Sequence, residues 1–265
     1  MKRKLFACAL AAALAAGTAA VPAAAAVRSV PVQVDGTLLS TQGRLSDGVT
    51  YIPLRDLLDA VGGWEIRWDA ATRSAVAQSA EHTLRADPIH CTLTLDGHTY
   101  AAAVYVLEGR TYVPLRIAIQ LLGGYAAWDG YLGGAAVTSP GAEHDAVELY
   151  WLSHIISAES QGEPMEGQIA VGNVVLNRVA SENFPDTIPD VIFEYNGAAQ
   201  FEPVENGTVF HEPADQSVVA AVRALKGETT VDGCLYFYAP ALSEGTWINE
   251  NCTYSTTIGG HRFYR

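Results

Sequence analysis

Basic side chains are scarce in this sequence. Its 265 residues include 16 lysines and arginines against 29 aspartates and glutamates, which gives a formal net charge of −13. A chain with this excess of negative charge repels the phosphates of nucleic acids. We therefore expect no nucleic acid among its partners.

Long apolar runs are missing after residue 26, so we expect no stable insertion of the mature chain into a membrane. The first 26 residues are different. A basic cluster at Lys2–Lys4 precedes an apolar run at 5–16, and three alanines at 24–26 supply small residues before a cleavage site. This order is typical of a secretory signal peptide. It predicts a secreted or cell-wall protein whose signal peptide is residues 1–26.

Cysteine is rare as well. The chain after the predicted signal peptide contains Cys91, Cys234 and Cys252. In an oxidising extracellular setting, Cys234 and Cys252 could form a disulfide across one loop. A zinc site built from these two cysteines and His261 is the alternative, although no C-x-x-C pair accompanies them. We expect neither a metal nor a cofactor.

Several catalytic signatures are absent. His211-Glu212-Pro213 is not followed by the second histidine of a metalloprotease helix, and its proline would break that helix. The sequence has no G-x-S-x-G elbow, no phosphate-binding loop and no G-x-G-x-x-G motif. What remains for catalysis is a carboxylate with aromatic and amide neighbours.

Residues 27–140 contain an internal repeat. GVTYIPLRDLLDAVGGWEIRWD at 48–69 is echoed by GRTYVPLRIAIQLLGGYAAWD at 109–129. Each copy predicts a short strand, a Pro-Leu-Arg turn into a helix, a Gly-Gly stop and another strand. We therefore predict an α+β domain built from two equivalent halves.

The Y-[IV]-P-L-R element of each copy, at 51–55 and 112–116, carries a resemblance to a known family. It resembles the copper amine oxidase N-terminal-like stalk domains of exported bacterial proteins, over nearly all of residues 27–140. No copper centre is expected, because the histidines of this domain lack metal-ligand spacing. We interpret Arg55 and Arg116 as side chains that tie each helix to a neighbouring strand.

A Pro/Gly-containing linker at 138–142 leads to a second domain, predicted at 144–265. Apolar residues at 147, 150, 151, 154, 155 and 158 are spaced as one face of a helix. Gly162 and Pro164 end that helix, and a second helix, apolar nearly all round, follows at about 166–180. Further along, the sequence predicts a short helix at 190–195, a polar loop at 196–212, a helix at 214–226, an extended segment at 235–238 and a closing Gly-rich loop at 256–260.

Glu159 lies at the end of the first of these helices, against the buried second helix. One interpretation is an ordinary solvated glutamate at a helix end. The other is a general acid, whose pKa is raised by apolar neighbours so that the carboxyl stays protonated near neutral pH. Glu163 is a second candidate carboxylate, but we prefer to interpret it as a charge favourable to the start of the next helix.

Aromatic and amide side chains in the second domain suit a carbohydrate ligand. Sugar rings stack on aromatic faces, while amides hydrogen-bond to hydroxyl and N-acetyl groups. A place in the core is the alternative for most of them, and tyrosine and tryptophan in long loops are the better candidates. The predicted substrate-binding residues are Gln168, Gln200, Phe201, Tyr236, Tyr238, Trp247, His261 and Tyr264.

The second domain carries its own resemblance, in a series of ordered motifs. They are ESQGEP at 159–164, EGQ at 166–168, VLNRV at 175–179, QF at 200–201, LYFY at 235–238 and TTIGGHRFY at 256–264. They resemble the SleB-type cell wall hydrolases, the spore cortex-lytic family. The resemblance implies a lysozyme-like α+β fold, one essential glutamate at Glu159, and cleavage of peptidoglycan glycan strands, typically as a lytic transglycosylase. Ser160-Gln161 departs from the Ala-Arg of many members, which removes a positive charge beside the acid.

A single carboxylate suffices for this reaction. Most retaining and inverting glycosidases use two, whereas in a lytic transglycosylase the C6 hydroxyl of muramic acid attacks its own anomeric carbon. Glu159 would protonate the glycosidic oxygen and then accept the proton of that hydroxyl. If Glu163 instead activates water, the enzyme is a hydrolysing muramidase.

A different class of function is also open from the sequence. A cell-wall-binding or adhesion protein would keep a hydrolase-like domain that has lost activity. The resemblance implies peptidoglycan glycan strands as the partner, and the sequence leaves protein partners unidentified. It does not separate spore cortex from vegetative wall as the substrate.

Overall fold

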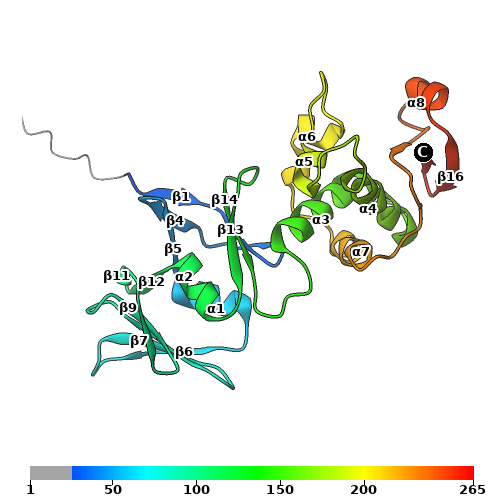
Figure 1. Cartoon of the computed structure of the whole chain (residues 1–265). Helices are drawn as coiled ribbons and strands as arrows, with labels where there is room; N and C mark the ends of the chain where they lie inside the picture. The colour runs from blue at the N-terminus through cyan, green and yellow to red at the C-terminus, as the bar shows by residue number, and fades with distance from the viewer. Residues whose placement is uncertain (1–25) are drawn as a thin grey trace, which may run out of the picture.

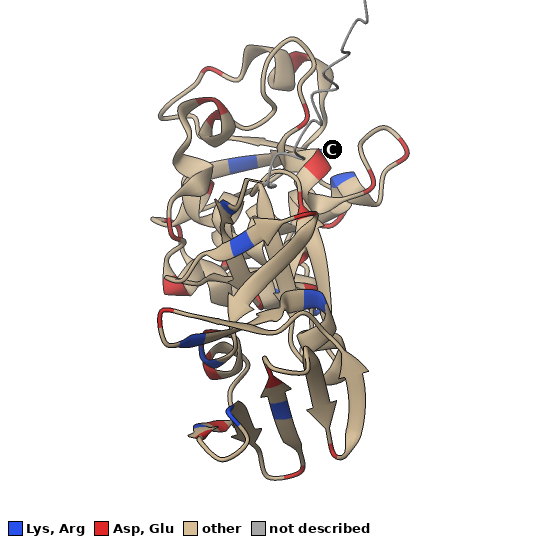
Figure 2. Ribbon diagram, turned by 90° about the vertical axis from the view of Figure 1, so that its left-hand side faces the viewer, with Lys and Arg blue, Asp and Glu red and all other residues tan. Residues whose placement is uncertain are grey.

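The computed structural model describes residues 26–265 (Figure 1). The predicted signal peptide, apart from its last residue, lies outside the described residues. Across residues 26–265, no helix combines the length and hydropathy that crossing a bilayer requires. Acidic positions outnumber basic ones along the ribbon (Figure 2), with 12 acids and 8 arginines at 27–144 and 17 acids and 5 basic residues at 145–265.

The buried side chains form separate cores, one drawn from residues 32–137 and two from residues 150–263. We call the parts that contain them the N-terminal region (26–145) and the C-terminal region (146–265). Both mix helices and strands, as expected from the sequence.

Three sheets make up most of the N-terminal region. The first has the order β1 (Arg28–Val30), β4 (Gly43–Ser46), β5 (Val49–Pro53), β12 (Arg110–Pro114) and β11 (Tyr105–Leu107). The second is a meander of β6 (Glu65–Asp69), β7 (Ser74–Gln78), β8 (Thr83–Asp87), β9 (Thr92–Leu95) and β10 (His98–Ala101). The third has the order β13 (Tyr125–Asp129), β14 (Gly134–Thr138), β2 (Val32–Val34) and β3 (Thr37–Leu38).

One order of elements occurs twice in this region. A strand, a helix and a two-stranded hairpin follow one another as β5, α1 (Leu54–Val61), β6 and β7, and again as β12, α2 (Leu115–Leu121), β13 and β14. β5 and β12 pair with each other antiparallel, with Val113 opposite Ile52. Arg55 Nη2 donates to the carbonyl of Ile66 in β6 at 3.3 Å, which is the tie between helix and strand that the sequence predicted.

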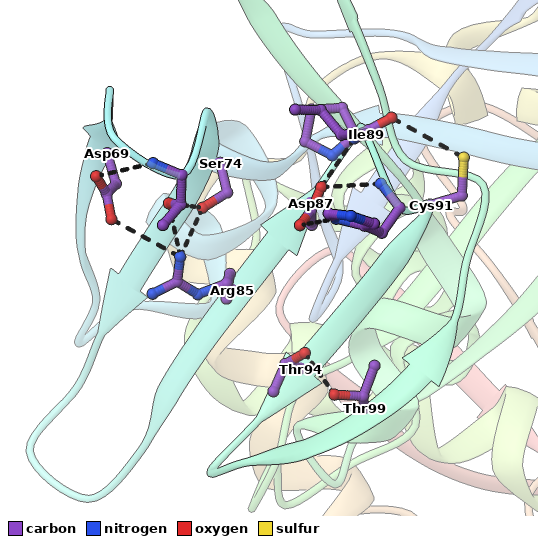
Figure 3. A network of polar contacts seen from close by, with 11 residues as sticks. Asp69, Ser74, Arg85, Asp87, Ile89, Cys91, Thr94 and Thr99 are labelled. Atoms are coloured by element: carbon purple, nitrogen blue, oxygen red, sulfur yellow. Dashed lines mark hydrogen bonds and ion pairs between the residues drawn. The ribbon is translucent and has the colours of Figure 1, made fainter.

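Polar contacts fix the turns of the β6–β10 meander (Figure 3). Arg85 Nη1 donates to Ser74 Oγ at 3.0 Å and lies 3.7 Å from the Asp69 carboxylate. At the C-terminal end of β8, the Asp87 carboxylate accepts the backbone N–H of Ile89 at 2.8 Å. These contacts belong to the framework of the sheet.

The C-terminal region packs helices around α3 and closes with a small antiparallel sheet. Its helices are α3 (Ala146–Ser160), α4 (Met165–Val179), α5 (Ile188–Ile192), α6 (Glu202–Asn206), the 3-10 turn η1 (Thr208–Phe210), α7 (Asp215–Leu225) and α8 (Thr246–Asn251). Its sheet has the order β15 (Tyr236–Tyr238), β17 (His261–Tyr264) and β16 (Tyr254–Ile258).

Local sequence explains why α3 and α4 form where they do. The Asp145 side chain caps α3 by accepting the backbone N–H groups of Val147 and Glu148. Pro164 stands before the first residue of α4, where its missing N–H costs nothing. Gly172 lets α3, α4 and α7 approach closely, because a Cβ there would lie 2.8 Å from Ile156 Cδ1 and 3.3 Å from Ala224 Cβ.

Two predicted loops were wrong. The polar loop predicted at 196–212 contains α6 and η1. The closing Gly-rich loop is a β-hairpin, in which Ile258 pairs with His261 across a two-residue turn. Gly259 has a φ of 56° in that turn, a left-handed conformation that tight hairpin turns need and that glycine adopts without strain.

The cysteines remain separate. Cys91, Cys234 and Cys252 are all free thiols, so the disulfide considered between Cys234 and Cys252 is not formed. The alternative zinc site is not formed either, since no group of three histidine, cysteine or acidic side chains within residues 26–265 is arranged to hold a metal ion.

The two regions touch through the β13–β14 turn. The buried Asp129 carboxylate accepts the indole N–H of Trp151 in α3 at 2.7 Å. The phenol of Tyr131 donates to Asp190 at 2.6 Å, and its ring stacks on Phe193 with centroids 4.3 Å apart. The N-terminal region therefore supports both α3 and the end of α5.

Candidate active site

Glu159 lies in the last turn of α3 and is half-buried. The helix stops one residue later, and the chain turns through 161–164 before α4 begins at Met165. The seven residues that precede Ala158 in α3 are all buried, among them Trp151, Ile155 and Ile156. The carboxyl is thus delivered to the edge of a densely packed core.

Burial raises the pKa of Glu159 to about 7, because the surrounding protein disfavours the charged form. The nearby Glu202 raises this pKa further, while Arg178 opposes the shift. A carboxyl with this pKa exchanges a proton readily near neutral pH, as a general acid and base must.

Arg178 of α4 is the buried cation of this site. Its guanidinium lies 5.0 Å from the ring centroids of Phe184 and Phe201, and 5.5 Å from that of Tyr236. Its Nε donates to the carbonyl of Leu235 at 2.8 Å. Burial lowers the pKa of Arg178, and Tyr236, Glu194 and Glu159 counteract that effect.

A cavity of about 580 Å³ opens beside Arg178, within the size range of small-molecule sites. Glu159 does not line it directly, but is coupled electrostatically to Arg178, which does. Within residues 26–265, neither Arg178 Nη1 nor Glu194 Oε2 has a hydrogen-bond partner although both atoms are buried. The cavity is lined by Arg178, Asn183, Phe184, Glu194, Asn196, Gln200, Leu235, Tyr236, Phe237, Trp247 and Ile248.

Three of the predicted substrate-binding residues lie together on this lining, namely Gln200, Tyr236 and Trp247. The rings of Tyr236 and Trp247 pack edge to face, 5.6 Å apart, and the Trp247 side chain is 58% exposed. An exposed aromatic face beside an amide is the arrangement that the sequence predicted for a sugar site.

The other predicted residues stand behind the lining. Gln168 is fully buried, and its amide donates to the carbonyls of Gln161 and Glu163, which fixes the turn after Glu159. Phe201 is buried beneath the Arg178 guanidinium.

Three further predicted residues lie on the closing sheet, and two of them anchor α8. The hydroxyls of Tyr238 and Tyr264 both contact the amide of Asn249, at 3.0 and 2.7 Å. Because Asn249 belongs to α8, these tyrosines hold the helix that carries Trp247. His261 is buried against Phe237, with ring centroids 5.4 Å apart.

Glu163 is held by the β16–β17 hairpin. Its Oε2 accepts the backbone N–H of Gly260 at 2.8 Å, and its Oε1 lies 3.7 Å from His261 Nδ1. A Cβ on Gly259 would come within 1.8 Å of the same carboxylate. The turn therefore covers this side chain closely, and its carboxylate joins the 161–164 turn to the hairpin.

Both regions match known families. Residues 162–264 match the family described as Cell Wall Hydrolase, and residues 32–135 match the Copper amine oxidase N-terminal domain. The chain carries a cell wall hydrolase domain. Both resemblances stated from the sequence are confirmed. Glu159 lies three positions before the range matched to the hydrolase family.

The cell wall hydrolase domain is similar to named proteins and to a solved structure. The spore cortex-lytic enzyme of Oceanobacillus iheyensis is 36% identical over 101 residues, which are 38% of this chain and 36% of that protein. The enzyme of the same name from Bacillus cereus is 34% identical over 101 residues, 38% of each chain. A solved catalytic domain of the germination-specific lytic transglycosylase SleB from Bacillus anthracis is 31% identical, and the match covers 46% of this chain and 98% of that one with a TM-score of 0.42. The chain spans little more than a third of the length of these curated relatives.

Sequence reasoning missed several residues of the hydrolase domain site. Arg178 and Glu194 face the cavity with unpaired polar atoms, and neither was among the candidates. The signal for Arg178 was present, because an arginine in a helix that is otherwise apolar nearly all round is a charge that burial must stabilise. Glu194 and Asn196 lie outside helices and strands, where the spacing of residues in the sequence does not predict which way their side chains point.

Proposed function

We propose that this chain cleaves the glycan strands of peptidoglycan, with Glu159 as general acid and then general base. The observation that carries the proposal is a half-buried carboxyl with a pKa of about 7, coupled to Arg178 beside a cavity lined by aromatic and amide groups. The family match and the spore cortex-lytic relatives support the substrate class.

In the first step, protonated Glu159 gives its proton to the glycosidic oxygen, and the bond between that oxygen and the anomeric carbon of muramic acid breaks. The leaving sugar departs with a hydroxyl. The C6 hydroxyl of the same muramic acid then bonds to the anomeric carbon, and its proton passes to the Glu159 carboxylate. No water is consumed, the product has a 1,6-anhydromuramoyl end, and the acid is restored.

Arg178 supports the intermediate stage of this cycle. Its buried positive charge favours the carboxylate form of Glu159, opposing the effect of burial. We propose that sugars contact Gln200, Tyr236 and Trp247, which line the cavity, while Gln168, Phe201, Tyr238, His261 and Tyr264 hold those walls in place.

Glu163 has a supporting role in this proposal. Its carboxylate is engaged by the Gly260 N–H and covered by the hairpin turn, which leaves it poorly placed to activate water. That arrangement supports the single-carboxylate mechanism over the muramidase alternative.

The experiment compares two isosteric substitutions on purified peptidoglycan. Glu159→Gln should reduce release of 1,6-anhydromuropeptides by at least about 100-fold, while circular dichroism shows an unchanged fold. Glu163→Gln is the matched control and should keep most of the release. Mass spectrometry of the products decides between anhydro and reducing ends. Release by Glu159→Gln at the wild-type rate would overturn the proposal.

The organisation of the chain belongs to the same proposal. Residues 1–26 act as a signal peptide that directs export to the cell wall, residues 27–140 form the stalk domain of two internal repeats, and residues 144–265 form a lysozyme-like catalytic domain. The twofold order of elements and the separate cores support these boundaries. N-terminal sequencing of the exported protein should find residue 27 first.

A further inference from the structure

The N-terminal region contains two pockets built from corresponding residues. One lies where Pro53–Arg55 and Trp68 face the strand start at 109–111, and encloses about 210 Å³. The other lies where Pro114–Arg116 and Trp128 face the strand start at 48–50, and encloses about 410 Å³. Each copy of the sequence repeat therefore supplies the helix start of one pocket and the strand start of the other.

A tryptophan stands open at the wall of each pocket. Trp68 is 50% exposed and Trp128 is 45% exposed. Each is paired across its hairpin with an alanine, Ala75 or Ala135. Both indoles are thus partly open to solvent, and neither ring belongs to the buried core of the region.

Arginines gather at the same two places. Of the eight arginines at 27–144, four line the pockets: Arg55, Arg67, Arg110 and Arg116. Arg110 is paired with Asp56 at 3.2 Å. Arg67 and Arg116 form no ion pair with any other residue in the range 26–265. Arg28 adds a fifth guanidinium, 6.0 Å from the Trp128 ring centroid.

Open aromatic faces and unpaired guanidinium groups together define a ligand class. An indole face binds the apolar face of a sugar ring, and a guanidinium binds carboxylates. Two corresponding sites in one region suit a ligand whose units repeat. The chain has a net charge of −13 and repels anions over most of its surface. The clustered arginines offset that repulsion locally, so an anionic polymer can bind there.

We propose that these two pockets bind a peptidoglycan glycan strand, with sugar rings on Trp68 and Trp128 and the carboxylates of its stem peptides on Arg67 and Arg116. The N-terminal region then holds the chain on the polymer that the C-terminal region cleaves. The choice of this polymer rests on the proposed function.

The test measures retention of the full chain on insoluble peptidoglycan that has been freed of phosphodiester-linked wall polymers. All variants carry Glu159→Gln, so that cleavage does not disturb binding. Trp68→Ala and Trp128→Ala should each weaken retention about ten-fold, and the double variant should weaken it more. Trp128→Tyr, which keeps an aromatic face, should recover part of the loss. Arg116→Gln should weaken retention chiefly at low salt.

The matched control is Tyr100→Ala, which removes a side chain that is 45% exposed on β10 and lines neither pocket. It should leave retention unchanged. Retention of the double variant within two-fold of its parent, at unchanged circular dichroism, would overturn the proposal, as would Trp-dependent binding to a purified phosphodiester-linked wall polymer alone. Failure of the proposed function appears separately, as cleavage by Glu159→Gln.

Discussion

At the scale of single residues, Glu159 is held in a place that is unfavourable to its charge. Burial raises its pKa to about 7 from the usual 4.5, so the folded chain binds a proton that the unfolded chain releases between these values. The stability gained from burying the neutral carboxyl is fully present below about pH 4.5 and is lost as the pH rises through about 7. The general acid role that we propose for Glu159 therefore conflicts with stability at this residue.

This conflict predicts a pH-dependent gain in stability for Glu159→Gln, whose amide has no charge to bury. At pH 8 the variant should unfold with a free energy higher than that of the wild type by up to about 3 kcal/mol, and at pH 4 the two should be equal. Urea unfolding at the two pH values measures the difference. Glu182→Gln, which changes an exposed glutamate, is the control and should show no such trend. An equal effect of Glu159→Gln at both pH values would contradict the raised pKa.

At the scale of elements, the helices around α3 were predictable because their buried apolar residues recur in the sequence at the spacing of a helix face. α3, α4 and α7 begin and end within one or two residues of the predicted positions. α6, α8 and the closing hairpin were missed, because they are short segments without an apolar period and are fixed by contacts from distant chain. The site divides in the same way: Glu159 was marked by its helix, whereas the cavity depends on Arg178 and on loops that converge only in three dimensions.

The tight crossing of α3, α4 and α7 at Gly172 predicts a packing cost. Gly172→Ala places a methyl group 2.8 Å from Ile156 Cδ1. It should lower the free energy of unfolding by about 1–2 kcal/mol, even though alanine favours helix over glycine. Chemical denaturation measures this loss.

A second substitution tests whether that cost arises from the clash. Ile156→Val removes the Cδ1 atom that the new methyl group meets. The double variant Gly172→Ala/Ile156→Val should be more stable than the sum of the single effects predicts, because the two sites share one space. Strict additivity of the two effects would assign the loss to another cause.

At the scale of the whole molecule, the two regions are joined by a buried hydrogen bond as well as by the chain. Asp129 holds its own turn through the backbone N–H groups of Tyr131 and Leu132, both at 3.0 Å, and reaches across to Trp151 with its other oxygen. In the first hairpin, Asp69 accepts the corresponding backbone N–H groups of Ala71 and Thr72. Within residues 26–265 it forms no hydrogen bond to the C-terminal region. Of the two corresponding hairpin turns, only the β13–β14 turn thus forms a joint, a hydrogen-bonded contact with the C-terminal region.

This difference predicts that Asp129→Asn destabilises the region to which Asp129 does not belong. Asparagine can keep the turn with its carbonyl oxygen, but its amide nitrogen cannot accept the Trp151 N–H. The C-terminal region should lose about 2 kcal/mol, seen as a fall of about 5 °C in its melting temperature by differential scanning calorimetry. Asp69→Asn is the matched control and should leave that melting temperature in place. Equal effects of the two substitutions would show that the joint adds nothing.

The length of α3 gives this joint a mechanical meaning. Trp151, which donates to Asp129, and Glu159 both belong to α3, and the eight residue steps from one to the other extend about 12 Å along the helix. The helix is a rigid spacer between the N-terminal region and Glu159. If the N-terminal region grips a glycan strand, the cut falls at a set distance from the grip, and the protein works as a ruler along the polymer. Fragment length then reflects the shape of the molecule and not only the chemistry of its carboxyl.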